Sequence, residues 1–213
     1  MTFLRLVGRD VARAYGSGGA AWPVAFFLLT ATLFPFAIGP DAALLSRVGG
    51  GIVWAAALLA ALLPVERLVA PDLEAGVLDQ FAVRGIPITL VAAAKTLAHW
   101  LAFAPPLMAA ALVAAGLLDL SAETLLRVEL GLLIGTPGLA SLAVATGALV
   151  AGLRGAGAVA GLVMLPLAVP LLIFGAGALT EGAGAFKLLG AVSLLLIAGG
   201  PFVAAAAIRA GMD

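Results

Sequence analysis

Residues 130–153 read LGLLIGTPGLASLAVATGALVAGL, a run of 24 residues without a charged side chain. A helix that crosses the hydrocarbon core of a bilayer, about 30 Å thick, needs about 20 predominantly apolar residues, because each residue rises about 1.5 Å. The run is apolar throughout and does not alternate with polar residues, so it is unlike a strand of a membrane barrel. Residues 130–153 therefore predict a membrane-crossing helix.

Five further stretches have the same character, and together they predict an all-α integral membrane protein with six spans. The spans leave too few residues for a folded soluble domain, so residues 1–213 are expected to form a single transmembrane domain. The first span is not expected to be a cleaved signal peptide, because an organised segment precedes it. The prolines at 166 and 170 leave open whether residues 166–184 form one span or a broken, re-entrant one. The expected spans are residues 20–39, 46–65, 94–118, 128–153, 156–179 and 187–208, each to within a few positions.

The composition of the chain supports this class. Hydrophobic residues make up 64% and charged residues 10%, with a mean hydropathy of +1.23, whereas a soluble domain carries about 25% charged residues. Eleven basic and eleven acidic side chains cancel, so no charge excess predicts binding to nucleic acid. With no cysteine and one histidine, the chain alone offers neither a thiolate metal site nor a multi-histidine metal or haem centre.

The placement of lysine and arginine predicts the orientation, because short cytoplasmic loops carry an excess of these residues. Seven or eight basic residues fall on one side of the six spans and three on the other. Both termini are therefore expected in the cytoplasm. The larger group is Arg5, Arg9, Arg13, Arg67, Arg84, Arg154 and Arg209, with Lys95 at a helix mouth, and the smaller group is Arg47, Arg127 and Lys187.

Residues 1–15 predict an amphipathic helix in the cytoplasmic interface. Phe3, Leu4, Val7 and Val11 share an apolar stripe. Arginines 5, 9 and 13 repeat every four residues on another stripe, where we expect them over anionic lipid headgroups. The helix is either a simple positive-inside anchor or a contact for a specific partner, and the sequence favours neither.

Residues 66–86 form the longest polar segment and hold four of the eleven acidic residues. We expect Pro71 and Asp72 to start a short helix laid against the cytoplasmic mouth of the spans, with Leu73, Val77 and Phe81 on its apolar face. Acidic side chains are poorly placed against a negatively charged leaflet, so a protein partner with basic or polar groups is the favoured contact. The alternative is a solvated turn with a charged face.

Lys95 and His99 lie one helical turn apart at the start of the third span, and so share a face. They could hold an anionic group such as a haem propionate, since an ionisable residue inside the membrane is a candidate site. The favoured alternative is that Lys95 snorkels to the boundary while His99 hydrogen-bonds a neighbouring helix. Glu129, at the outer mouth of span four, is expected to be a solvated helix end, with a proton relay as the less favoured alternative.

Motifs for nucleotide hydrolysis and for catalysis are missing from the sequence. The chain has no Gly-x-x-x-x-Gly-Lys phosphate loop and no His-Glu-x-x-His pair, and its single histidine limits any catalytic triad. We therefore expect a non-catalytic membrane subunit, with no catalytic residues and no metal ligands of its own. Any ATP hydrolysis would belong to a partner subunit.

Several short motifs of the chain, rich in polar residues and proline, resemble those of the CcmB family. Members of this family are the permease subunit of the cytochrome c maturation apparatus. The resemblance keeps its order over nearly the whole chain. Its strings are Leu33-Phe34-Pro35 with Ile38-Gly39-Pro40; Glu66-Arg67-Leu68 followed by Asp72-Leu73, Gly76, Leu78 and Gln80; Lys95 with Ala98-His99-Trp100; Gly135-Thr136-Pro137; and Leu165-Pro166-Leu167 with Pro170-Leu171-Leu172-Ile173-Phe174.

The resemblance implies an ABC exporter permease-like fold in the bacterial inner membrane, with a cytoplasmic coupling helix between spans two and three. It implies that two copies pair with two CcmA-type ATP-binding subunits, and associate with the haem-handling CcmC and the small CcmD. ATP hydrolysis would then be tied to releasing the haem-loaded chaperone CcmE. Haem is implied as a handled or transported ligand, and one histidine without cysteine favours transmission of force over carriage of haem.

Two groups of residues follow from the resemblance as expected sites. The polar intramembrane group, which would hold a haem propionate, is Lys95, His99 and Trp100. The residues expected to couple to the ATPase are Glu66, Arg67, Leu68, Asp72, Leu73, Glu74, Gly76, Leu78, Asp79 and Gln80.

Three other classes remain open. The first is a structural scaffold that carries no substrate and only holds the haem-handling proteins together. A general permease for lipid or drug is weaker, and it would predict activity with lipid substrates and no cytochrome c defect when the gene is deleted. An intramembrane enzyme is the weakest alternative, because the sequence offers no set of catalytic residues.

Overall fold

The computed structural model describes residues 2–39, 41–153, 155–180 and 182–212, and these ranges contain nine helices. Three residues used in the sequence argument, Arg154, Pro40 and Met1, lie outside the described ranges. The helices are α1 (Thr2–Gly16), α2 (Ala21–Ile38), α3 (Ala42–Leu62), α4 (Val65–Glu74), α5 (Val77–Val83), α6 (Ile88–Leu117), α7 (Ala122–Val150), α8 (Ala156–Gly177) and α9 (Ala183–Met212).

Six stretches of helix are long and apolar enough to cross a membrane, which confirms the predicted all-α class and the number of spans. They are α2, α3 with its continuation α4, and α6 to α9. Several begin before the expected start: α6 starts at Ile88, directly after Pro87, and not near residue 94, because the uncharged residues 88–94 continue the helix ahead of Lys95. Helix α8 continues through Pro166 and Pro170 to Gly177, so this part of the chain is one continuous helix.

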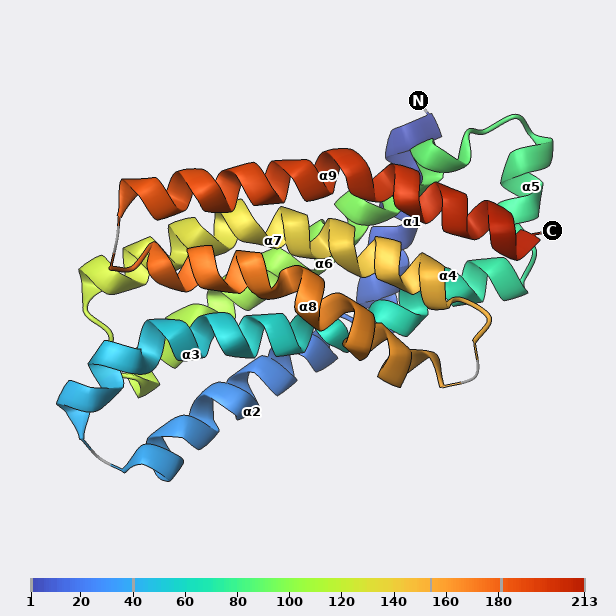
Figure 1. Ribbon diagram of the computed structural model, residues 1–213. Coiled ribbons are helices and arrows are strands. Elements are labelled where there is room, and N and C mark those ends of the chain that lie inside the picture. Colours follow the sequence, from blue (N-terminus) through green and yellow to red (C-terminus); the bar gives the residue numbers. More distant parts are fainter. Residues whose placement is uncertain (1, 40, 154, 181, 213) are drawn as a thin grey trace.

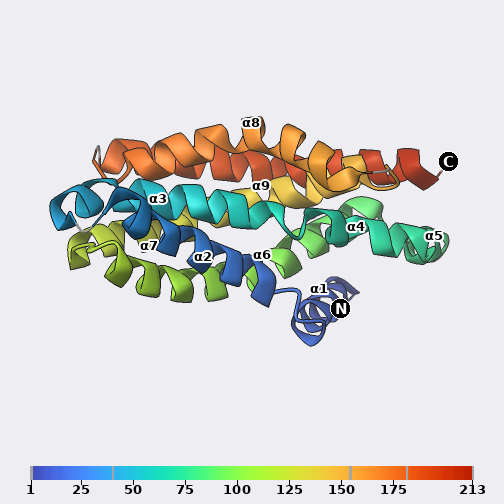
Figure 2. The same cartoon turned by 90° about the horizontal axis from the view of Figure 1, so that it is seen from below.

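The long helices lie side by side as an elongated bundle (Figures 1 and 2). Helices α1, α4 and α5 and the last turn of α9 gather at one end, so both ends of the chain lie at that end of the bundle. The first turns of α3, α7 and α9 lie at the opposite end. An even number of crossings brings both chain ends to the same end, and the short helices α1, α4 and α5 lie there too.

Helix α7 is the centre of the bundle and contacts α3, α4, α6, α8 and α9. Its sequence explains this position, because glycines on its surface let other helices approach closely. Trp54 of α3 is fully buried and packs where Gly131 and Gly135 of α7 leave room for its ring. Small residues therefore set the spacing of the spans, as expected where lipid supplies no hydrophobic drive for helix association.

A methyl group at Gly138 is expected to destabilise the bundle. The Gly138 amide donates a hydrogen bond to Ser193 Oγ of α9 at 3.0 Å, and a Cβ there would lie 2.8 Å from the Ser193 Cα. Gly138→Ala should therefore cost about 1–3 kcal/mol, the usual range for overpacking. The measurement is the thermal midpoint of the purified protein in detergent.

Gly161 provides the matched control, because no atom lies within 4 Å of where its Cβ would be. Gly161→Ala should leave the midpoint unchanged or raise it slightly, since alanine is the better helix former. Equal midpoints for the two variants would show that α7 and α9 are not packed as closely as described.

Candidate functional site

The segment between α3 and α6 folds into two short helices, where the sequence predicted one. Helix α4 follows α3 after a break at Leu63 and Pro64, and Pro71 lies inside it. The expectation that Pro71 starts the helix is therefore wrong, because the break at Pro64 sets the start. Gly76 adopts a left-handed conformation with φ of 66°, which ends α4 and separates it from α5.

The two helices divide the residues expected at the ATPase contact into exposed and buried groups. Glu66, Arg67, Glu74, Asp79 and Gln80 are exposed, whereas Asp72 and Leu78 are buried within the chain, and Leu68, Leu73 and Gly76 are half-buried. Val83, in the last turn of α5, is 89% exposed, although it is apolar. Helices α4 and α5 lie at the end of the bundle that holds both chain ends (Figure 1). We call four exposed residues from the end of α4 and from α5 the α4–α5 surface: Glu74, Asp79, Gln80 and Val83.

Asp72 is the centre of a buried ionic cluster. Its Oδ2 lies 2.5 Å from Nζ of Lys95 and 2.7 Å from Nη2 of Arg9, and its Oδ1 lies 2.6 Å from Nη1 of Arg13. The side chains of Asp72 and Lys95 are only 1% and 5% exposed. Lys95 Nζ also donates to the Leu68 carbonyl at 3.0 Å. One carboxylate thus joins α1, α4 and α6.

The cluster gives its members contacts that the sequence did not predict. Arg9 and Arg13 bind Asp72, and Lys95 is paired with the same carboxylate inside the molecule. A hydrogen bond from Arg13 to Asp72 and the carboxylate's charge raise the pKa of Arg13 above its ordinary value. Asp72 is used within the chain, so its side chain is not on the surface where a partner could reach it.

Helix α1 packs through a slightly different stripe from the one predicted. Leu6 and Val7 are buried, and Phe3 and Val11 pack beside them, whereas Leu4 is exposed. These side chains meet residues of α4, α6 and α9 in one apolar cluster. Helix α1 is therefore anchored to the bundle by apolar contacts and by the Asp72 cluster together.

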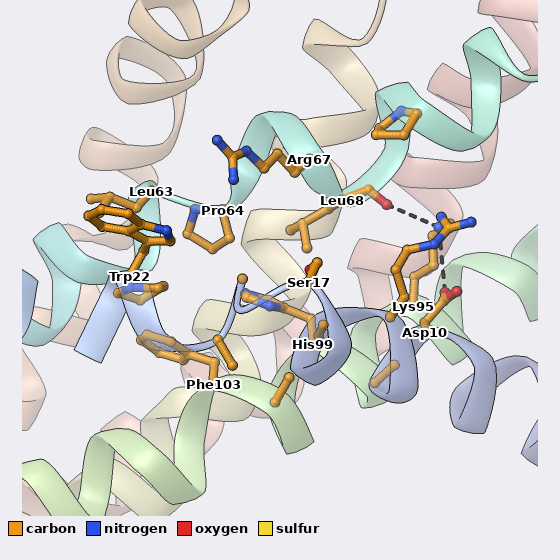
Figure 3. A pocket seen from close by; sticks show the side chains of 18 residues that line it. Asp10, Ser17, Trp22, Leu63, Pro64, Arg67, Leu68, Lys95, His99 and Phe103 are labelled. Atoms are coloured by element: carbon orange, nitrogen blue, oxygen red, sulfur yellow. Dashed lines mark hydrogen bonds and ion pairs between the residues drawn. The ribbon is translucent and has the colours of Figure 1, made fainter. Parts of the chain in front are cut away.

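A pocket of about 630 Å³ lies beside the cluster, between α1, the start of α2, the α3–α4 break and α6. Figure 3 shows His99 and Phe103 on one side of it and Leu63, Pro64 and Arg67 on the other. The His99 side chain is 8% exposed, and its Nε2 has no hydrogen-bond partner among the described residues. The expected hydrogen bond to a neighbouring helix is thus not made by that nitrogen.

The expected group of Lys95, His99 and Trp100 is only partly brought together. Lys95 and His99 line the pocket on the same face of α6, as the spacing predicted. Trp100 is outside the pocket lining, because its Nε1 donates to Thr136 Oγ1 of α7 at 3.1 Å. Glu129 also differs from expectation: it is half-buried, and its Oε1 finds no partner in the described part of the chain.

Sequence reasoning missed the partners of Lys95, although one signal pointed to them. A lysine near the end of a span requires a counter-charge, and Asp10 and Asp72 are two of the few acids on that side. The distances in sequence hid the pairing, since Asp72 and Asp10 lie 23 and 85 positions from Lys95. Within the described ranges, no three His, Asp or Glu side chains are grouped to hold a metal ion.

Comparison with known proteins gives matches along almost the whole chain. Residues 1–211 match the family described as CcmB protein. Heme exporter protein B of Bradyrhizobium diazoefficiens is 43% identical, covering 98% of this chain and 97% of that protein. The proteins of the same name from Rhodobacter capsulatus and Haemophilus influenzae are 41% and 39% identical, with 97% and 100% of this chain and 98% and 100% of each relative covered.

Proposed function

Because the chain belongs to the CcmB family, whose members include heme exporter protein B, we propose that it transmits ATP-driven motion from a partner ATPase across the membrane. The family makes it a membrane subunit of a haem-export system. The finer proposal is that the α4–α5 surface is the contact with a CcmA-type ATP-binding subunit. The observation that supports it most is this surface of exposed acids and an exposed valine, at the end of the bundle that holds both chain ends.

Coupling would act through the Asp72 cluster. A push on α4 and α5 reaches Asp72, and through its ion pairs reaches Lys95 of α6 and the arginines of α1. Helix α4 also follows directly from α3, so α3, α6 and α1 would move with it as a unit. Rigid-body movement of packed helices is a common form of switching.

The proposed complex follows the sequence expectation. Two copies of the chain would bind two ATP-binding subunits in the bacterial inner membrane, with both termini in the cytoplasm. CcmC-type and CcmD-type subunits would handle haem, and ATP hydrolysis would release the haem-loaded chaperone CcmE for delivery outside that membrane. Haem enters this scheme as the cargo of the complex, and the ATP is bound by the partner subunit.

The test is the ATPase activity of the co-purified permease and ATP-binding subunit, with and without the haem-loaded chaperone and its handling subunit. We expect stimulation that requires both additions. Co-purification without any stimulation would favour the scaffold function. Failure of the two proteins to co-purify would contradict the proposal.

Val83→Asp should weaken assembly with the ATP-binding subunit. An apolar side chain that is 89% exposed on the proposed contact would become buried there, and burying a valine contributes about 1.5 kcal/mol or more. We expect at least a tenfold loss of ATPase subunit recovered with the tagged permease, at an unchanged level of permease in the membrane. Leu4→Asp is the control, because Leu4 is also exposed but lies on α1.

A further inference from the structure

The pocket beside the Asp72 cluster combines an apolar lining with polar groups, and not all of these groups have a hydrogen-bond or ion-pair partner within the described chain. Trp22, Phe103, Leu63 and Pro64 supply apolar wall. His99 Nε2 is buried without a hydrogen-bond partner in the described chain, and His99 lines the pocket. A buried polar atom without a partner is costly, so a ligand that hydrogen-bonds it removes that cost.

The charge of the pocket is positive. Four cations, Arg9, Arg13, Arg67 and Lys95, belong to the pocket or to the adjoining cluster, against the two carboxylates of Asp10 and Asp72. Arg67 makes no ion pair with any described residue, and Arg13 remains about half exposed while bound to Asp72. The excess of two positive charges favours an anionic ligand.

The depth of the pocket coincides with one membrane boundary. Helix α2 has 18 residues and so is about 27 Å long, close to the thickness of the hydrocarbon core. Its first turn supplies Trp22 and Pro23 to the pocket. Tryptophan is enriched at the level of lipid headgroups, which agrees with this placement. The pocket therefore opens where phosphate groups of one leaflet are found.

We propose that this pocket binds the head of an acidic phospholipid from that leaflet. Arg67 and the outer side of Arg13 would hold the phosphate, His99 would hydrogen-bond the head, and Trp22 and Phe103 would contact the first carbons of an acyl chain. Arginine suits this role because its planar guanidinium donates two parallel hydrogen bonds to phosphate. The site goes beyond coupling to an ATPase and does not depend on it.

The site predicts which lipid the protein retains. The purified chain in detergent is titrated with dioleoylphosphatidylglycerol or dioleoylphosphatidylcholine, and bound lipid is counted by native mass spectrometry. We expect retention of the anionic lipid and about tenfold weaker retention in Arg67→Gln. Arg84→Gln is the matched control, because Arg84 is exposed in the same segment but is not part of the pocket. Equal loss in both variants, or equal retention of both lipids, would overturn the proposal.

Haem is another amphiphile with acidic groups that this pocket could accept. A second experiment distinguishes haem from an acidic phospholipid. Hemin is added to the protein, and its absorption band is recorded for the unmodified chain and for His99→Phe. A hemin complex that depends on His99 and is not displaced by phosphatidylglycerol would show that the pocket takes haem instead of lipid. Displacement of hemin by the lipid, or no hemin complex at all, supports the lipid site.

Discussion

Asp72→Asn is expected to destabilise the folded protein by about 3 kcal/mol or more, the usual cost of removing one partner from a buried ion pair. Asp72 is 1% exposed and lies between Lys95, Arg9 and Arg13. Without its charge, Lys95 is left buried with only the more distant Asp10, whose Oδ2 is 3.5 Å away. The measurement is the thermal midpoint of the purified chain in detergent, together with the rate at which protease removes α1.

Two variants make this result specific to the cluster. Glu74→Gln, only two residues away, changes an exposed carboxylate that makes no ion pair in the described structure, and should leave the midpoint unchanged. Adding Lys95→Met to Asp72→Asn removes the stranded buried cation and should recover part of the lost stability, because Arg9 and Arg13 can reach water. A midpoint for Asp72→Asn equal to that of Glu74→Gln would show that the cluster does not hold α1 in place.

Reversing the two acids of the α4–α5 surface, Glu74→Lys with Asp79→Lys, is expected to reduce stimulated ATPase activity at least tenfold. Both side chains are exposed, so the change alters the surface by four charge units without disturbing the buried cluster. A contact that pairs them with cations of the ATPase would become repulsive, which costs several kcal/mol. The activity is measured on the co-purified complex with the haem-loaded chaperone and its handling subunit present.

The neutral pair Glu74→Gln with Asp79→Asn is the control for this reversal. Asp79 lies in the first turn of α5, where a negative charge favours the helix by about 0.3–1 kcal/mol, and the neutral pair also removes that effect. We expect the neutral variant to keep most of the stimulation. Full activity in the reversed variant would mean that the α4–α5 surface is only a solvated turn.

The six membrane-crossing helices could be predicted because each is formed by one continuous apolar stretch of the sequence. A long apolar run requires a helix in lipid, whatever its neighbours are. The ends of the helices were less predictable, since α6 begins at Ile88, well before residue 94, and α4 starts at Val65 instead of Pro71. Helix ends depend on local capping and on packing at the boundary, which hydrophobicity alone does not describe.

The candidate site was harder to predict, because its parts come from four separate segments. The sequence identified Lys95 and His99 as neighbours on one helix face, and both do line the same pocket. It did not bring Asp72 to Lys95, since the pairing depends on how the chain folds back between α4 and α6. The acidic composition of residues 66–86 suggested a charged exterior for all four acids, whereas one of them is the most deeply buried charge in the described chain.

The most direct test of the central claim is a cross-link from the α4–α5 surface to the ATPase. The chain has no cysteine, so Gln80→Cys creates a single thiol on an exposed position without any background. A bifunctional cross-linker should join this thiol to the ATP-binding subunit in membranes, and ATP should change the yield. Ser46→Cys, at the opposite end of the bundle, should give no such product. A cross-link to the ATPase from position 46 and none from position 80 would contradict the account.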